Sequence, residues 1–171
     1  MDFAALSAAR YSLRKFSAQP VEAEKLDLIL EAGRSAPTAK NLQPQRFFVM
    51  QSPEALEKVD SCVECHFHPP VVLVVAYDPK AAWDREIDGK NHGEIDAALA
   101  TAQMMLQAAE LGLGTTYVGM FDPEKLRAAF PEQFEGLTPI AVLPLGYPAE
   151  TAHPSRLHND RKPLEELVTR L

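Results

Sequence analysis

An apolar run, VVLVVA at positions 71–76, constrains the fold of this chain more than any other feature. A continuous run of this kind is typical of a strand buried on both faces, because a strand with one solvated face alternates apolar and polar residues. We predict two further core strands at 46–50 and 140–145, and an extended segment at 115–119. A strand buried on both faces needs packed layers on each side, so the chain is predicted to be α+β or an α/β sandwich.

Helical periodicity marks several segments between these strands. One helix follows Pro20, with Gly33 expected as the residue that ends it, and the longest runs from Glu94 to Leu111 until the glycines at 112 and 114 stop it. Polar residues that favour N-cap positions stand before three helices, and they are Asp2, Ser52 and Asp122.

Composition places the chain among globular proteins. Its 171 residues are 46% hydrophobic and 24% charged, which is enough to bury a core, and we expect a single domain over 1–171. No apolar run reaches the roughly 18–20 residues of a membrane span, and the first residues lack a secretory pattern, so we expect a cytoplasmic protein with no membrane association. The net charge of -7 and the pI of about 5.2 argue against nucleic-acid binding, which needs a broad basic face.

A cluster of cations near the N-terminus stands out in this acidic chain. Positions 10–16 read RYSLRKF, so that Ser12 lies between Arg10 and Arg14. Two forked guanidinium groups and a hydroxyl are the donors that suit a phosphate dianion. The same cluster could instead be a solvated basic surface patch, and spacing alone leaves this open.

Four further segments, taken together with this basic cluster, favour an anion-binding site over a solvated surface patch. They are SAPTAKNLQP at 35–44, GLGT at 112–115 leading to FDP at 121–123, LGYP at 145–148 and RKPLEE at 161–166. With RYSLRKF, in this order and spacing, the chain resembles the nitroreductase family of FMN-dependent oxidoreductases over essentially its whole length. The resemblance implies a nitroreductase-like α+β flavin sandwich, with a mixed or antiparallel central sheet flanked by helices. It also implies an intertwined homodimer with FMN at the dimer interface.

The resemblance also implies roles for individual residues. Arg10 and Ser12 are expected to hold the FMN phosphate, and Arg14 to lie near the pyrimidine side of the ring. Gly119 and Met120 are expected to present backbone N–H groups to ring N5 and O4. The loop from Pro37 to Gln43 should line the flavin from the second subunit, and the tail should close on the phosphate. The full set of implied cofactor-binding residues is Arg10, Tyr11, Ser12, Arg14, Pro37, Thr38, Ala39, Asn41, Gln43, Tyr117, Val118, Gly119, Met120, Arg161 and Lys162.

The activity implied by the resemblance is hydride transfer from NADH or NADPH to flavin N5. Reduction of a nitroaromatic, a quinone or a similar electron-poor small molecule would follow in a ping-pong cycle. Because the flavin carries this chemistry, no catalytic side chain is expected. The sequence agrees, since it shows no convincing Ser/His/Asp set or paired carboxylates.

One segment suggests a different class of function. Positions 62–68 read CVECHFH, and the four soft or borderline ligands Cys62, Cys65, His66 and His68 could bind zinc or another transition metal. They would then serve a metal- or flavin-binding sensor or storage protein. Cys62 and Cys65 could instead form a redox pair, or the segment could be an incidental loop, and the residue pattern leaves all three possibilities open.

Four further side chains carry expectations. Trp83 either anchors the segment at 78–93 or stacks on a flavin. Asp96 is expected to complement the dipole of its helix, or else to pair with an arginine. His153, like His158, is expected to face solvent in a turn.

Overall fold

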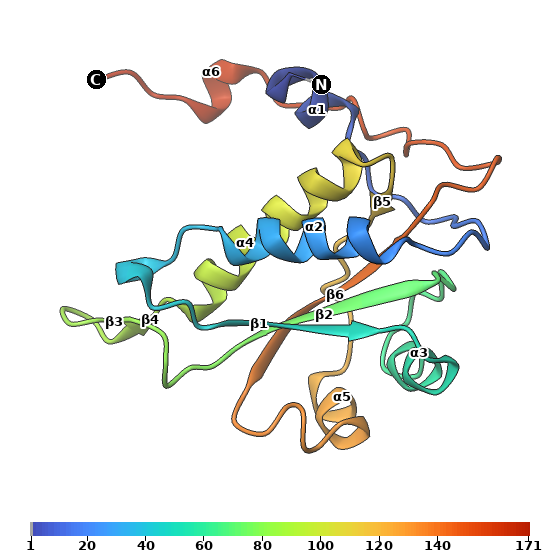
Figure 1. Cartoon of the computed structure of the whole chain (residues 1–171). Helices are drawn as coiled ribbons and strands as arrows, with labels where there is room; N and C mark the ends of the chain where they lie inside the picture. The colour runs from blue at the N-terminus through green and yellow to red at the C-terminus, as the bar shows by residue number, and fades with distance from the viewer. Residues whose placement is uncertain (1) are drawn as a thin grey trace.

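A four-stranded sheet with the order β1-β2-β6-β5 lies at the centre of the computed structural model, which describes residues 2–171 (Figure 1). Its strands are β1 (Gln45–Met50), β2 (Val71–Tyr77), β5 (Gly114–Thr115) and β6 (Thr138–Gly146). All neighbouring strands pair antiparallel, and Ser12 adds a parallel bridge to Thr115 at the β5 edge. The fold is α+β, and the predicted core strands are confirmed.

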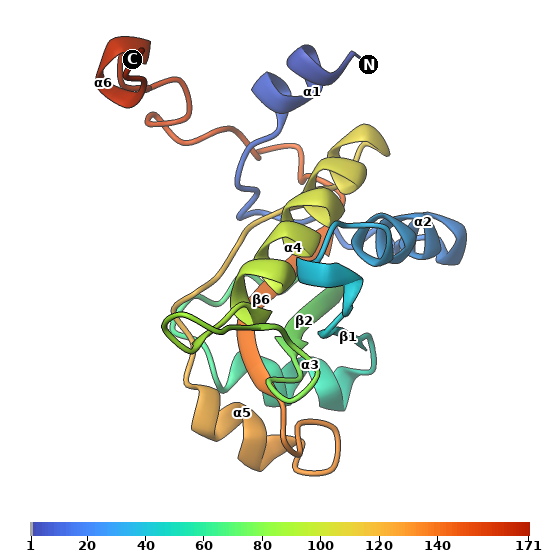
Figure 2. The ribbon, with the colours of Figure 1, turned by 90° about the vertical axis from the view of Figure 1, so that its left-hand side faces the viewer.

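Helices cover both faces of this sheet. The helices α2 (Ala23–Arg34) and α4 (Gly93–Glu110) pack on one face, and α3 (Pro53–Asp60) and α5 (Pro123–Ala129) lie on the other (Figures 1 and 2). The side chains of β2 alternate between the two layers: Leu73 and Val75 join the core under α2 and α4, while Val72 and Val74 join the core beside α3 and α5. The uninterrupted apolar run therefore reflects a strand with a core on each side.

Local sequence signals set where most helices begin. Asp2 accepts a hydrogen bond from the Ala5 backbone N–H at the start of α1 (Phe3–Ala9), and Ser52 does the same for Ala55 at the start of α3. Asp122 caps α5, which has a proline at its first turn. All three predicted caps are confirmed.

The expected end of α2 at Gly33 is wrong, because this glycine lies inside the helix, which runs to Arg34. A Cβ on Gly33 would stand 2.8 Å from Met104 Cγ and 2.8 Å from Phe47 Cζ. The missing side chain thus lets α2 approach α4 and the sheet closely. Glycine at this position serves packing and not chain termination.

Two regions are less regular than the sequence suggests. The extended segment predicted at 115–119 pairs as β5 only to Thr115, and contact with β6 resumes at a single bridge between Val118 and Val142. The segment at 78–93 forms a short hairpin of β3 (Asp84–Arg85) and β4 (Lys90–Asn91), and a 3-10 turn, η1 (Ala39–Asn41), precedes β1.

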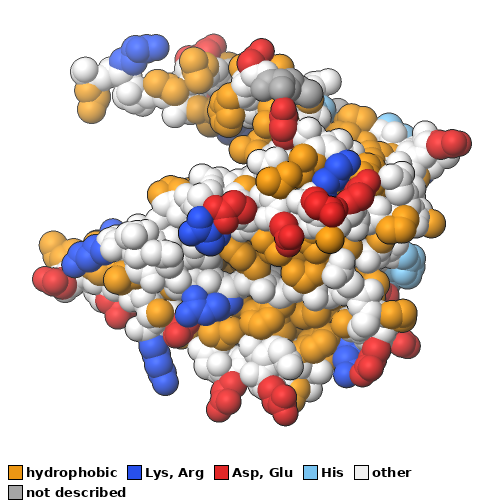
Figure 3. All heavy atoms as spheres, in the orientation of Figure 1, with side chains coloured by type: hydrophobic (Ala, Val, Ile, Leu, Met, Phe, Trp, Pro, Cys, Tyr) orange, Lys and Arg blue, Asp and Glu red, His pale blue; other side chains and the backbone are white. Residues whose placement is uncertain are grey.

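The two ends of the chain stand apart from this body. The helix α1 and the chain from 153 onward, which includes α6 (Leu164–Leu167), form projections that we call the arms (Figures 1 and 2). In the space-filling view a notch separates the end of the arms that carries α6 from the body (Figure 3), whereas α1 contacts α4. Large apolar side chains of the arms are exposed, namely Phe3, Leu157, Leu164, Leu167 and Val168. Within residues 2–171 no helix has the length and apolar character needed to cross a membrane.

Candidate functional site

The cationic N-terminal segment lies against the β5 edge of the sheet. Leu13 donates its backbone N–H to the Thr115 carbonyl at 2.9 Å and is itself buried. A Cβ on Gly114 would stand 2.4 Å from Leu13 Cδ2, so only glycine permits this approach. Because side chains alternate along extended backbone, Ser12 and Arg14 point away from the core that Leu13 enters.

A hollow of about 390 Å³ opens beside these side chains, and its lining residues are Ser12, Arg14, Lys15, Ala152, His153 and Ser155. Among residues 2–171 no carboxylate pairs with Arg10, Arg14 or Lys15, although Arg14 donates to the Ser12 carbonyl at 3.2 Å. Nearby, the hydroxyl of Thr115 is buried and has no hydrogen-bond partner within the same residues. Ser12, Arg14 and Lys15 thus bring to the hollow a hydroxyl and two cations without carboxylate partners, which are donors of the kind that an anion needs.

The rest of the tail lies on the arm. His158 Nε2 stands 3.0 Å from the Ala8 carbonyl, and its ring meets that of Tyr11 edge-on, with centroids 6.2 Å apart. Arg161 donates to the neighbouring Asp160 carbonyl, and Lys162 stands 3.5 Å from Glu166. The polar contacts of Arg161 and Lys162 therefore stay within the arm, and one chain does not bring them onto the hollow.

The loop from Pro37 to Gln43 has a strained backbone. Lys40, Asn41 and Gln43 adopt φ values of 52°, 55° and 53°, which are unusual for residues other than glycine. The Thr38 hydroxyl accepts from the Gln43 backbone N–H at 3.1 Å. Strain of this kind is retained where the surroundings fix the backbone, and it is frequent at ligand sites.

Asp96 provides much of that support. It lies in the first turn of α4, is 2% exposed, and its Oδ1 accepts from the Ala39 backbone N–H at 3.0 Å. Its Oδ2 is buried without a partner within residues 2–171. Asp96 lies in the first turn, where it was expected to complement the helix dipole, but its carboxylate also connects α4 to a loop 57 positions away. The alternative pairing with an arginine does not occur within residues 2–171.

Trp83 anchors the hairpin. Its ring centroid lies 4.8 Å from that of His92, and Lys40 Nζ lies 5.4 Å from the Trp83 ring. The indole therefore packs between the hairpin, the start of α4 and the loop at Lys40.

The two predicted cofactor segments lie at opposite ends of α4. Arg10 and Tyr11 line a small cavity with Ala109 and Gly112 at the C-terminal end of this helix, whereas the Pro37–Gln43 loop is tied to Asp96 at its N-terminal end. The 18 residues of α4 span about 27 Å at 1.5 Å per residue. One chain therefore does not bring these two segments together.

The segment at 117–120 presents free backbone donors. Val118 is held by its bridge to Val142, and the next two residues, Gly119 and Met120, are exposed. Within residues 2–171 the N–H groups of Gly119 and Met120 donate to no acceptor. Tyr117 donates to the Ile140 carbonyl at 3.3 Å, and burial, with a smaller effect of the Glu94 carboxylate, raises the pKa of this phenol.

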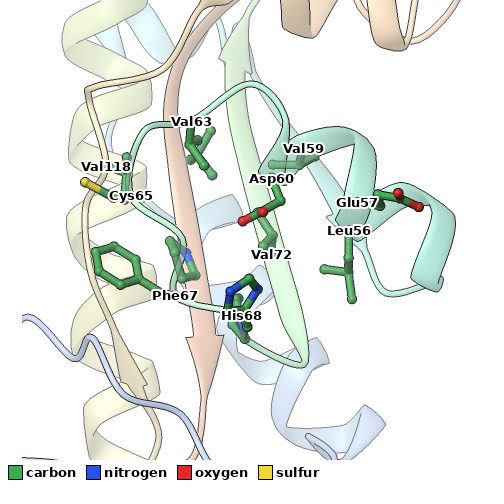
Figure 4. Close-up of a pocket in the computed structure, with 13 residues that line it drawn as sticks. Leu56, Glu57, Val59, Asp60, Val63, Cys65, Phe67, His68, Val72 and Val118 are labelled. Carbon is green, nitrogen blue, oxygen red and sulfur yellow. The ribbon is translucent and has the colours of Figure 1, made fainter.

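The cysteine and histidine segment does not form a metal site in the part of the chain that the structure describes. Both cysteines are free thiols: Cys62 is buried against the Lys58 carbonyl, while Cys65 is exposed. His66 Nδ1 lies 2.8 Å from Asp60 Oδ2, but over residues 2–171 no three His, Cys, Asp or Glu side chains gather to share an ion. The segment instead forms one wall of an apolar cavity (Figure 4).

Sequence reasoning missed two contributions to the candidate site. His153 is exposed, as expected, but it also lines the hollow beside Arg14, which the sequence did not indicate. The role of Asp96 depends on a contact between distant segments, although the acid itself was visible.

Comparison with known proteins agrees with this architecture. The model of the nitroreductase family matches residues 8–67 and 60–147. An NADH dehydrogenase from Thermus thermophilus is 30% identical over 191 aligned positions, which cover 93% of this chain and 91% of the relative. A solved nitroreductase family protein from Clostridium difficile is 38% identical with a TM-score of 0.91, covering 99% of this chain and 98% of its own. A related protein from Desulfovibrio desulfuricans, solved in complex with FMN, is 26% identical with a TM-score of 0.79, covering 100% and 98%. The chain belongs to the nitroreductase family.

Proposed function

We propose that this protein is an FMN-dependent oxidoreductase that takes hydride from NADH or NADPH and reduces small electron-poor molecules. The observation that carries the proposal is the set of donors without carboxylate partners at the β5 edge of a protein of net charge -7: Ser12 and Arg14 line the hollow, and Arg10 lines a second small cavity with Thr115. The relative from Desulfovibrio desulfuricans binds FMN, and the one from Thermus thermophilus is named for NADH. Both descriptions support hydride transfer between a nicotinamide and FMN.

The donors fit the parts of FMN that need them. The guanidinium of Arg10 and the hydroxyl of Ser12 suit the phosphate, and Arg14 would place a positive charge by the pyrimidine, which favours the reduced anionic ring. The free N–H groups of Gly119 and Met120 would face ring N5 and O4. FMN, when bound, supplies hydride acceptance at N5 and electron transfer to a nitroaromatic or quinone, with the two substrates binding in turn.

We further propose that the working unit is a homodimer of one nitroreductase-like domain, residues 1–171. On α4, Ile95 and Leu99 are 39% and 44% exposed and point away from the core, and the arms leave more apolar side chains uncovered. A second copy would bury these surfaces. It would also bring the Pro37–Gln43 loop of one chain to the cationic hollow of the other. The cytoplasm, where NAD(P)H is regenerated, is the compartment that this proposal implies.

An absorption spectrum of the purified protein, followed by anaerobic addition of NADH or NADPH, tests the proposal. Flavin bands that bleach with the nicotinamide and return with a nitroaromatic are expected. A protein that stays colourless after incubation with FMN would contradict it.

A charge variant then tests the phosphate site. Arg10→Ala should weaken FMN retention by roughly tenfold or more, because a charge-assisted contact contributes about 1.5–3 kcal/mol. Lys58→Ala is the control, since it removes one cation from α3 on the opposite face of the sheet. Equal FMN retention in both variants would contradict the assignment of Arg10.

A further inference from the structure

An apolar cavity of about 390 Å³ lies on the α3 side of the sheet, away from α4 (Figure 4). Its volume falls within the range of sites that bind small molecules, roughly 300–1,000 Å³. Of the residues assigned to FMN, only Val118 lines it. Its apolar walls come from α3, the connection to β2, and the sheet, and they are Leu56, Val59, Val63, Phe67, Val72, Val118, Val142 and Pro144.

One charged group faces this apolar space. Asp60 and Glu57 both line the cavity, but the Asp60 carboxylate points in among the other labelled lining residues, whereas the Glu57 carboxylate points away from them (Figure 4). The Asp60 side chain is 34% exposed, and its Oδ2 lies 2.8 Å from His66 Nδ1. Its Oδ1 accepts no hydrogen bond from any of residues 2–171. The cavity therefore offers one carboxylate oxygen, Asp60 Oδ1, that has no hydrogen-bond partner among residues 2–171.

The connection between α3 and β2 holds the cavity open. His68 has a φ of 47°, a strained conformation for a residue that precedes a proline. Pro69 and Pro70 follow and lead directly into β2. The prolines restrict where the chain can enter the sheet, so the wall formed by Phe67 and His68 is not free to collapse onto Val72.

We propose that this cavity binds a small aromatic cation, such as an aryl amidine. The ring would pack among Leu56, Phe67 and Val72, and its N–H group would donate to Asp60 Oδ1. Apolar walls disfavour a fully hydrated ion, and the carboxylate disfavours an anion. A flat ring bearing a cationic donor satisfies both conditions. The inference goes beyond the proposed function and does not depend on the cofactor.

Titration with benzamidine, followed by NMR of the valine methyl groups in the protein as purified, tests this assignment. The signals of Val63, Val72 and Val142 should shift and saturate. Benzoate, which has the same shape and the opposite charge, should bind at least tenfold more weakly. Leu56→Trp should abolish the benzamidine shifts, because the larger side chain occupies the cavity. The methyl spectrum of this variant without ligand reports whether the fold is kept.

A matched pair of charge variants on α3 isolates Asp60. Asp60→Asn should weaken benzamidine binding about three- to tenfold, since a charge-assisted hydrogen bond becomes a neutral one at a partly exposed site. Glu57→Gln removes the same charge but points away from the cavity, so its affinity should change by less than about twofold. Equal effects of the two variants, or equal binding of benzoate and benzamidine, would overturn the proposal. The proposal would also be overturned if benzamidine competed with NAD(P)H and left the signals of the cavity valines unshifted, because benzamidine would then lie at the flavin site.

Discussion

Replacing Asp96 tests how the strained loop at the proposed dimer interface is held. In Asp96→Ala the Ala39 backbone N–H loses its acceptor, 3.0 Å away in the structure. A hydrogen bond to a charged acceptor contributes about 1.5–3 kcal/mol, which corresponds to roughly 10- to 150-fold in a local opening equilibrium. We therefore expect the Ala39 amide to exchange with solvent faster by that factor.

The global stability should respond less than the loop. Asp96 is 2% exposed and its Oδ2 has no partner within residues 2–171, so the carboxylate is costly to bury. Its removal relieves this cost and offsets part of the lost hydrogen bond. The free energy of unfolding, measured by urea denaturation, should thus fall by less than the local opening free energy at Ala39.

Two variants make this prediction decisive. Asp96→Asn keeps an oxygen that can accept from Ala39, so much of the amide protection should return. Glu94→Ala removes an exposed carboxylate from the same helical turn and should leave Ala39 protected. The reasoning is refuted if Ala39 exchanges at the same rate in Asp96→Ala and the unmodified protein. It is also refuted if Glu94→Ala has an equal effect.

Three further perturbations follow from the packing and the charges. Gly33→Ala should lower the free energy of unfolding by about 1–3 kcal/mol, because the new Cβ would lie 2.8 Å from Met104 Sδ; an unchanged urea midpoint would contradict the close contact of α2 and α4. Removal of residues 153–171 should shift the protein toward monomer in sedimentation and weaken FMN binding, and a stable FMN-loaded dimer would argue against a role for the arm. Burial, then Glu94, raises the pKa of Tyr117 above its ordinary 10.0, so this phenol should ionise later than free tyrosine in an absorbance titration. Because the native pKa is the higher one, the stability from protonated Tyr117 is complete below about pH 10 and is lost as pH rises through the native pKa. Tyr117→Phe should remove that part of the alkaline loss.

Some features of the candidate site could be predicted from residue types alone. A pair of arginines around Ser12 in an acidic chain indicates an anion site, and the structure shows those arginines unpaired within residues 2–171. The cysteines and histidines at 62–68 suggested a metal site that the described residues do not form, because ligand spacing in sequence does not fix side-chain direction. In space Cys62 turns into the core while Cys65 faces solvent.

The sequence alone determined the elements whose signal is local. The apolar run at 71–76 specified a strand with a core on both faces, and the caps at Ser52 and Asp122 specified where helices begin, because these patterns act over a few residues. Only the tertiary structure decided what depends on distant segments meeting. The close approach that requires Gly33, and the 57-position reach from Asp96 to Ala39, are examples. Such contacts depend on how whole helices and strands pack together, and a local sequence pattern does not predict that packing.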